Sequence, residues 1–381
     1  MVDYQSKAPG VYVEEITPAG PIAGSGTSVT ALIGTVATPP ASAGLGQPVA
    51  VTNWNQYVAA FGDYKAGLNL PHAVRGFFAN GGTFAYVVPI KDNSVLDAAL
   101  EQLTRFKDVS LVCLPGVVDA TVQSKLIEHC DKLGDRFAIL DGAPDATPLN
   151  ADGALQKQRG GLLSKNGFAG LYWPWIQVSD PLADPAKPTT ISVPPSGHLA
   201  GVMARVDGAV GVHRAPANEP VRGAVALDYV LNDDEQGELN TKNVNALRTF
   251  PGSPPLVWGA RTLTDGTTWR YVNVRRLVSY IEDSLLEGLR WAIFAPHNLA
   301  LWKGLERSIG EFLDRVYESG ALFGATAKDA YYVSVDEANN PPATRNLGQV
   351  NIEIGLAVTR PAEYVVLRVG LWDGGTRITE G

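Results

Sequence analysis

The chain has 381 residues, of which 45% are apolar and 18% charged, and its formal net charge is −8. This composition is typical of a globular protein with a sizeable core, and it excludes a protein whose main task is to coat phosphates, since such binding depends on clustered Lys and Arg. The 40 glycines and 26 prolines indicate many turns. The two cysteines, Cys113 and Cys130, show neither a disulfide framework nor a metal-binding spacing.

No apolar run is long enough to cross a bilayer, and the N-terminus lacks the basic start and apolar stretch of a signal peptide. We therefore expect a protein made in the cytosol. The first 26 residues are rich in Pro and Gly but contain one dense strand-like hexapeptide, at 11–16. A strand so short, with no neighbour in sequence to pair with, must find a partner elsewhere or stay loose.

Between residues 29 and 207, short apolar stretches alternate with helical ones. Gly81 and Gly134 stand where two of these helices should end. Such alternation predicts an α/β layer with a largely parallel sheet. We expect strands at 29–36, 84–90, 110–114, 137–140 and 170–177, and helices at 70–80, 121–133, 156–164 and 197–207.

The last third shows the clearest periodicity. Apolar residues recur at helical spacing over 274–289 and again over 302–316, and the second helix carries charges on its other face. Among these charges Glu311 and Arg315 have the spacing of an i,i+4 ion pair. Two strands with alternating apolar residues follow, at 350–358 and 364–372.

Five stretches, taken in order, resemble the tail sheath proteins of contractile phages and, more narrowly, the sheaths of extracellular contractile injection systems. They are APGVYVEEI at 8–16, the runs 194–207 and 211–225, the run 258–298, Leu-Trp at 301–302 with GALFG at 320–324, and TRPAEYVVLRV at 359–369. The chain departs from the pattern at 295–298, where an acidic residue is expected before the proline. It also lacks the large inserted outer domains of longer phage sheaths.

This resemblance implies an α/β fold: a mixed, subtilisin-like sheath core with a C-terminal α+β subdomain and extended β-arms at both ends. The implied segments are an N-terminal arm at 1–26, an α/β sheath domain at 27–255, a C-terminal α+β domain at 256–360 and a C-terminal arm at 361–381. The implied function is structural. Subunits polymerise helically around an inner tube and contract to drive that tube through a target envelope.

The implied partners are identical or paralogous sheath subunits, the inner tube protein, and baseplate and terminal cap proteins. The resemblance implies no catalysis, cofactor, metal site, nucleic-acid partner or membrane insertion. It implies assembly in the bacterial cytoplasm, as part of a virion tail or of a released extracellular particle.

The residues themselves agree with this at both ends, because an unpaired terminal strand invites another chain to complete it. Pairing within the same chain is the alternative for each strand. We predict inter-subunit pairing for two sets of residues, the N-terminal arm Val11, Tyr12, Val13, Glu14, Glu15 and Ile16, and the C-terminal arm Tyr364, Val365, Val366, Leu367, Arg368, Val369 and Leu371.

Basic residues of the second long helix are candidates for contact with the tube, as the resemblance suggests for this part of the chain. They are Lys303, Arg307 and Arg315, and a solvated helix face is the alternative. Arg275 and Arg276 are adjacent and cannot share one helix face, so at least one of them should make an internal pair.

The sequence offers little for an enzyme. A catalytic triad would need Ser196, His198 and Asp141 in a hydrogen-bonded chain, but two residues of separation in a turn is poor geometry for a nucleophile and its base. Ser196 fits better as a helix cap. No phosphate-binding glycine pattern occurs, and the five histidines are scattered. The open alternatives to a sheath are another lattice-forming shell or tube protein and an α/β enzyme with an unrecognised site.

Overall fold

The computed structural model of this chain describes residues 21–40 and 44–366. These residues fall into two compact units. The larger one, here the α/β unit, contains residues 26–280 and 358–366, and the small unit contains residues 21–25 together with 281–357. The boundary between residues 280 and 281 lies inside helix α8 (Val272–Gly288).

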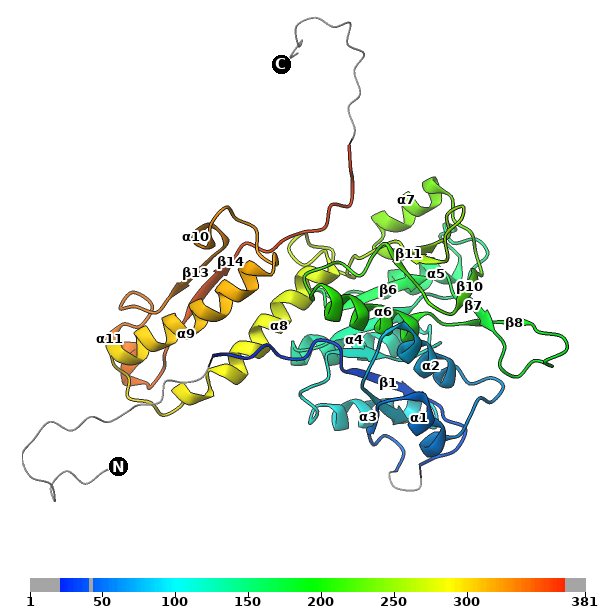
Figure 1. Ribbon diagram of the computed structural model, residues 1–381, viewed down its shortest axis with the longest axis horizontal. Helices are drawn as coiled ribbons and strands as arrows, with labels where there is room; N and C mark the ends of the chain where they lie inside the picture. Colours follow the sequence, from blue (N-terminus) through cyan, green and yellow to red (C-terminus); the bar gives the residue numbers. More distant parts are fainter. Residues whose placement is uncertain (1–20, 41–43, 367–381) are drawn as a thin grey trace, which may run out of the picture. The chain divides into compact units, whose positions relative to one another are not determined.

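The α/β unit is built on a mixed sheet, with nine strands in the described residues (Figure 1). Its six central strands, β3, β1, β4, β5, β6 and β11, run parallel, and antiparallel strands close both edges. The predicted parallel layer is thus confirmed. In spatial order the strands are β2 (Val49–Val51), β3 (Ala85–Pro89), β1 (Thr30–Gly34), β4 (Leu111–Cys113), β5 (Phe137–Asp141), β6 (Ala169–Trp173), β11 (Val244–Arg248), β12 (Leu256–Val257) and β9 (Glu219–Pro220).

Both faces of the sheet are buried under helices, which explains why its central strands are nearly all apolar. Along β1, Leu32 packs with α1 (Trp54–Phe61), α2 (Leu70–Asn80) and α6 (Ser196–Ala209). Its neighbours Ala31 and Ile33 point to the opposite face, where the apolar cluster includes residues of α3 (Leu96–Leu103), α4 (Ala120–Leu133), α5 (Ala154–Gly160) and α7 (Asp233–Thr241).

Both ends of α4 are capped by local groups. The Asp119 carboxylate accepts hydrogen bonds from the amides of Thr121 (2.8 Å) and Val122 (3.1 Å) at the start of α4. Gly134 ends this helix in the left-handed conformation, with φ of 75°. The predicted helix at 156–164 instead begins at Ala154 and ends at Gly160, before a second glycine.

The strand predicted at 170–177 is wrong as a single element. The structure divides it into β6 and β7 (Ile176–Ser179), and β7 belongs to a second, antiparallel sheet with β8 (Thr190–Val193) and β10 (Ala224–Leu227). Pro174 lies at the break. Proline has no N–H group to donate to a ladder, so the apolar run changes sheets there.

The small unit contains a long helix beside a two-stranded sheet. Helix α9 (Leu299–Glu318) begins at the cap Asn298, whose side chain accepts from the Leu301 amide at 2.9 Å. Strand β13 (Tyr331–Ser334) pairs antiparallel with β14 (Glu353–Leu356), so the strand predicted at 350–358 is shorter than expected. The small unit also contains the 3₁₀ turn η3 (Arg290–Ala292), α10 (Ala327–Ala330) and α11 (Pro342–Asn346). A further 3₁₀ turn, η2 (Asn93–Val95), precedes α3 in the α/β unit.

No helix within residues 21–40 and 44–366 is both long enough and apolar enough to cross a membrane. The predicted strand at 11–16 lies outside the described residues. Of the predicted strand at 364–372, only Tyr364–Val366 are described, and these three residues carry no strand assignment.

Candidate inter-subunit surfaces

The three residues considered for a catalytic triad do not form one. The buried Asp141 carboxylate binds Ser196 directly, accepting from its amide at 2.8 Å and from its hydroxyl at 2.7 Å. It also accepts from the Gly116 amide at 3.0 Å. His198 is buried against α2, and its Nδ1 has no hydrogen-bond partner in the described structure. A triad needs an exposed serine bonded to a histidine, which this arrangement does not provide.

The Asp141 cluster instead ties the end of β5 to the first turn of α6. Burial raises the pKa of Asp141 to about 6, although the bonds from Gly116 and Ser196 favour its charged form. Ser196 was expected to cap the helix, and that prediction is wrong in detail. Ser196 is the first residue of α6, Pro195 occupies the cap position, and the Ser196 hydroxyl points to Asp141.

The adjacent arginines of α8 both turn inward, in different ways. Arg276 forms a buried ion pair with Asp207 of α6, at 2.5 Å and 3.0 Å. The Arg275 guanidinium lies over the rings of Phe168 (4.4 Å) and Trp269 (4.1 Å). The prediction that at least one of the two makes an internal pair is confirmed.

Across the described ranges, no three side chains of His, Cys, Asp or Glu come together in a way that would hold an ion. The structural features that remain for function are the segment that leads into the C-terminal arm, the exposed two-stranded sheet, and the charged face of α9.

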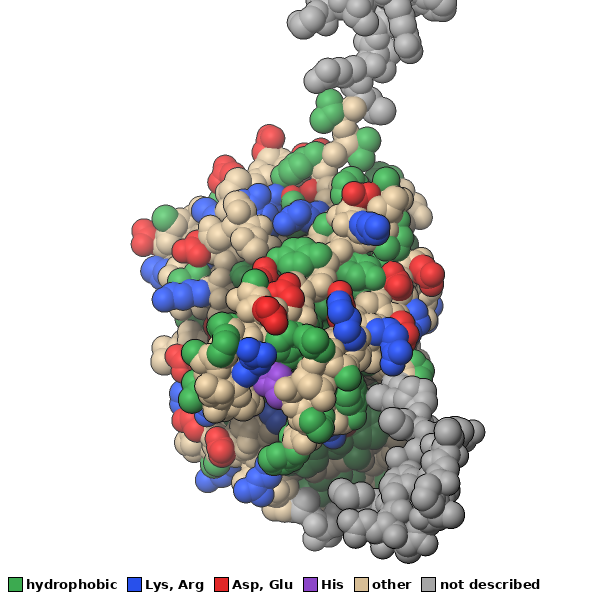
Figure 2. Space-filling view, turned by 90° about the vertical axis from the view of Figure 1, so that its left-hand side faces the viewer, with side chains coloured by type: hydrophobic (Ala, Val, Ile, Leu, Met, Phe, Trp, Pro, Cys, Tyr) green, Lys and Arg blue, Asp and Glu red, His purple; other side chains and the backbone are tan. Residues whose placement is uncertain are grey.

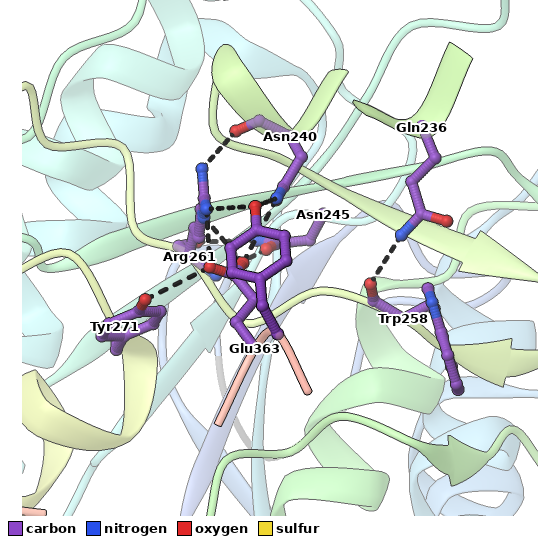
Figure 3. A network of polar contacts seen from close by, with 8 residues as sticks. Gln236, Asn240, Asn245, Trp258, Arg261, Tyr271 and Glu363 are labelled. Carbon is purple, nitrogen blue, oxygen red and sulfur yellow. Dashed lines mark hydrogen bonds and ion pairs between the residues drawn. The ribbon is translucent and has the colours of Figure 1, made fainter. Parts of the chain in front are cut away.

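The segment that leads into the predicted C-terminal arm is fastened to the α/β unit at one carboxylate (Figure 3). Glu363 receives two parallel bonds from the Arg261 guanidinium, at 2.8 Å and 2.6 Å. The Asn240 amide (3.3 Å) and the Tyr271 hydroxyl (3.2 Å) donate to the same carboxylate. The Tyr364 hydroxyl contacts Arg261 at 3.3 Å. We call Glu363 with Arg261, Asn240 and Tyr271 the clasp.

The clasp is partly shielded from water, with side-chain exposures of 11% for Arg261 and 21% for Glu363. Burial by itself would raise the pKa of Glu363, but the bonds from Arg261, Asn240 and Tyr271 outweigh it and hold that pKa below its ordinary value. Bidentate pairs between arginine and a carboxylate are among the stronger polar contacts in proteins.

Arg261 is itself locked to the central sheet. Its amide donates to the Asn245 side chain at 2.6 Å, and the Asn245 amide group donates back to the Arg261 carbonyl at 2.7 Å. Asn245 lies on β11 and is fully buried. Beside the clasp is a cavity of about 600 Å³ between α7 and the segment Pro361–Val365. The clasp therefore connects this segment to the sheet through two residues.

The sheet of β13 and β14 has an outer edge on each strand, with no further strand paired there among the described residues. One face packs on α9, where Val333 contacts the cluster of Leu301, Trp302 and Leu305. On β13 the Tyr332 side chain is 53% exposed, and its ring covers Gly355 of the partner strand. Two-stranded sheets are marginal alone, so this one is suited to accept further strands.

The three candidate tube residues of α9 differ in how they are engaged. Lys303 binds Glu306 at 2.6 Å, and Arg307 lies 3.9 Å from Glu311. Arg315 donates to the backbone carbonyls of Glu311 (2.9 Å) and Ile22 (2.7 Å). The expected pair of the Glu311 and Arg315 side chains is therefore wrong, because Glu311 faces Arg307.

Charges of both signs are interspersed with apolar side chains on the face drawn in Figure 2, without a large field of one sign. Large apolar side chains are also exposed in the connection between α8 and α9. Phe294 is the extreme case, since it is fully exposed and has a φ of 65°. Trp291 and Ile293 in the same connection are exposed too, as are Leu286 in the last turn of α8 and Leu299 at the start of α9.

Comparison with known proteins gives a consistent result. The family model described as the phage tail sheath protein central domain matches residues 92–263, and that of the phage tail sheath C-terminal domain matches 264–371. A putative prophage major tail sheath protein of Pseudomonas aeruginosa (strain UCBPP-PA14) is 25% identical over 73% of this chain and 69% of its own length.

Two solved structures are similar over 96% of this chain. One is the sheath complex of an extracellular contractile injection system (PVC) in the contracted state, with a TM-score of 0.80, 29% identity and coverage of 98% of that chain. The other is the contracted helical sheath of the anti-feeding prophage, with a TM-score of 0.78, 28% identity and coverage of 99%.

The clasp was not predicted from the sequence. Glu363 and Arg261 each lie in a stretch that carries the family resemblance, but they are 102 residues apart. Nothing in their local patterns indicates that they meet. A charged residue between small or apolar neighbours, as in Gly259-Ala260-Arg261 and Pro361-Ala362-Glu363, was the available signal.

Proposed function

Because this chain belongs to the phage tail sheath family, we propose that it is a structural sheath subunit that polymerises helically around an inner tube and contracts to drive that tube through a target envelope. The observation that carries the proposal is the similarity over 96% of the chain to sheaths solved in their contracted state. The likeness extends over both units of this chain, so it supports the function of the whole subunit.

The terminal arms join neighbouring subunits in this proposal, residues 11–16 at one end and 364–371 at the other. The acceptor is the sheet of β13 and β14, whose outer edges are open in the described structure. Each backbone hydrogen bond contributes a net of roughly 0.5–1.5 kcal/mol, so about four bonds per arm supply on the order of 2–6 kcal/mol. Head-to-tail joints of this kind generate open helices.

Support for the C-terminal arm comes from the exposure of its first residues. Tyr364, Val365 and Val366 are 72%, 80% and 77% exposed in the single chain. Apolar side chains that leave the body in this way gain free energy when a partner covers them. The boundaries of the arms at residues 26 and 361 belong to this proposal.

The tube contact belongs to this proposal too, with Lys303 and Arg307 as its best candidates. Both are exposed, and their ion pairs are surface pairs that are worth little and exchange readily. Arg315 is a weaker candidate because two backbone carbonyls already occupy its guanidinium.

The proposed subunit has no catalytic role and no cofactor. Its partners are identical or paralogous sheath subunits, the inner tube protein, and the baseplate and cap proteins of the same particle. It is assembled in the bacterial cytoplasm and works in a virion tail or a released particle. The alternative function is that of another lattice-forming shell or tube protein, which would have the same arms. Contractile helical order would distinguish a sheath from such a protein.

The test is electron microscopy of the full-length chain, alone and co-expressed with the tube protein of its particle. We expect hollow cylinders of helical order in at least one sample. Val13→Pro removes a ladder donor from the N-terminal arm and should abolish them. Ser6→Pro, outside the predicted strand, is the matched control and should leave them intact. Long sheaths from the Val13→Pro chain would refute the arm mechanism, and no cylinders in either wild-type sample would refute the sheath function.

A further inference from the structure

The clasp divides the C-terminal segment at a definite residue. Up to Glu363 the segment is bonded to the α/β unit: Asn273 contacts the Thr359 carbonyl at 3.4 Å, and Glu363 has its four bonds. At Tyr364 the hydroxyl accepts from Asn240 (3.2 Å) and Arg261 (3.3 Å), while the residue as a whole is 72% exposed. Val365 and Val366 have no hydrogen bond in the described structure.

The clasp ties the segment to the central sheet of the α/β unit. Two charge-assisted bonds in fork geometry join Glu363 to Arg261, and Arg261 is held by reciprocal bonds to Asn245 of the central sheet. Tyr271, which donates to the same carboxylate, immediately precedes α8. A pull on residue 364 therefore acts on β11 and on the start of α8, and not on a loose loop.

We propose that the clasp is the anchor of the C-terminal arm, which sets where the arm leaves the body and transfers tension from a neighbouring subunit to the central sheet. This inference rests on the proposed sheath function and names the residues that join its arm to its body. Without the clasp, the free tether would begin after Thr359, which Asn273 still holds, instead of at 364. Four more flexible residues would add up to about 14 Å of slack, at roughly 3.3–3.6 Å per residue.

Slack of this size matters because a joint that positions its neighbour loses effective concentration when its tether lengthens and loosens. The alternative is that the clasp only stabilises the folded subunit. The two readings differ in what a clasp variant does: loss of assembly with a nearly unchanged monomer in the first, and loss of monomer stability in the second.

The experiment uses three full-length variants. Glu363→Gln removes the charge and keeps the shape, Arg261→Glu opposes the carboxylate, and Arg261→Glu with Glu363→Arg restores the pair in reverse. Asp233→Asn is the matched control, since Asp233 lines the same cavity and pairs with Arg248 at 2.7 Å but does not contact the segment. Each is measured for hydrogen exchange of residues 358–366, thermal midpoint, and sheath yield with the tube protein.

We expect Glu363→Gln and Arg261→Glu to accelerate exchange in 358–366 by about tenfold or more, with the thermal midpoint shifted by only a few degrees. Sheath yield should fall by about tenfold in both single variants, and the reversed pair should recover most of it. Asp233→Asn should behave as the wild type.

Wild-type assembly by Glu363→Gln and Arg261→Glu would overturn the anchor and leave the sheath function standing. A fall in the thermal midpoint large enough to account for the lost sheath yield would also overturn the anchor. So would a loss of sheath yield that the reversed pair does not restore, if hydrogen exchange in residues 358–366 is unchanged. If the wild-type chain itself forms no sheath, the proposed function fails first and the anchor falls with it.

Discussion

Replacing Arg276 by methionine should be among the most destabilising single changes in this protein. The Arg276 guanidinium binds Asp207 with two bonds and also donates to the Thr27 carbonyl at 2.8 Å. The Thr27 hydroxyl donates to the same carboxylate at 2.8 Å. Both charged side chains are only 4% exposed. This cluster joins α8, α6 and the segment before β1.

Methionine keeps much of the volume of arginine but leaves the Asp207 carboxylate buried without its cation. Breaking a buried ion pair by removing one partner costs about 3–5 kcal/mol, because the remaining charge is uncompensated. For a unit of this size, that loss corresponds to a decrease in melting temperature of roughly 6–20 °C. The Thr27 hydroxyl, which already binds Asp207, offsets only part of the cost.

The assay is thermal and urea unfolding of the purified full-length chain, followed by circular dichroism. Arg276→Met with Asp207→Leu should recover most of the lost stability, since replacing both partners by apolar residues is often close to neutral. Lys303→Met is the control, because its pair with Glu306 is 78% and 39% exposed, and it should change stability by less than about 1 kcal/mol. An Arg276→Met chain within 1 kcal/mol of the wild type would refute the reasoning.

Three further predictions concern other parts of the chain. Burial raises the pKa of Asp141 from 3.8 to about 6. The free energy of unfolding should therefore fall by about 3 kcal/mol as pH rises from 4 to above 6, because the folded chain holds this proton more tightly than the unfolded chain. A free energy of unfolding that stays constant over this pH range, or an Asp141→Asn chain with the same slope, would contradict the prediction. Gly355→Val should displace the exposed Tyr332 ring, because a Cβ at this position would lie 2.0 Å from it. The free energy of unfolding should stay almost unchanged, while the sheath yield falls. A yield equal to that of the wild type would argue against the β13–β14 sheet as acceptor. Burial raises the pKa of both Cys113 and Cys130, which are free thiols. A disulfide reagent should therefore modify the native chain about a hundredfold more slowly than the unfolded chain. Rapid modification of the native chain would show that the core opens.

Elements with strong periodicity were predictable. The helices at Leu70–Asn80 and Ala120–Leu133 begin and end within one residue of their predicted bounds, because proline, aspartate and glycine at their ends impose local geometry. The short helices α1, α3 and α7 were missed, although Asn53 and Asn232 cap two of them. Their apolar faces are only two turns long, which is too short for a periodic signal.

For polar pairs between distant segments, the sequence indicated that a buried charge needs a partner but not which residue is that partner. The adjacency of Arg275 and Arg276 required that one of them turn inward, but it could not name Asp207 as the partner. The division of 170–177 between two sheets likewise depended on which strands lie beside each half, although Pro174 was visible.

The sequence by itself determined the α/β class, the two long helices near the C-terminus and the family, because these follow from periodicity and from motifs that local residues carry. Only the tertiary structure decided that Glu363 meets Arg261, that Asp141 binds Ser196 directly, and that the β13–β14 sheet stands with open edges. These contacts join residues far apart in the chain. Whether two such groups meet depends on the packing of every element between them, which no local pattern encodes.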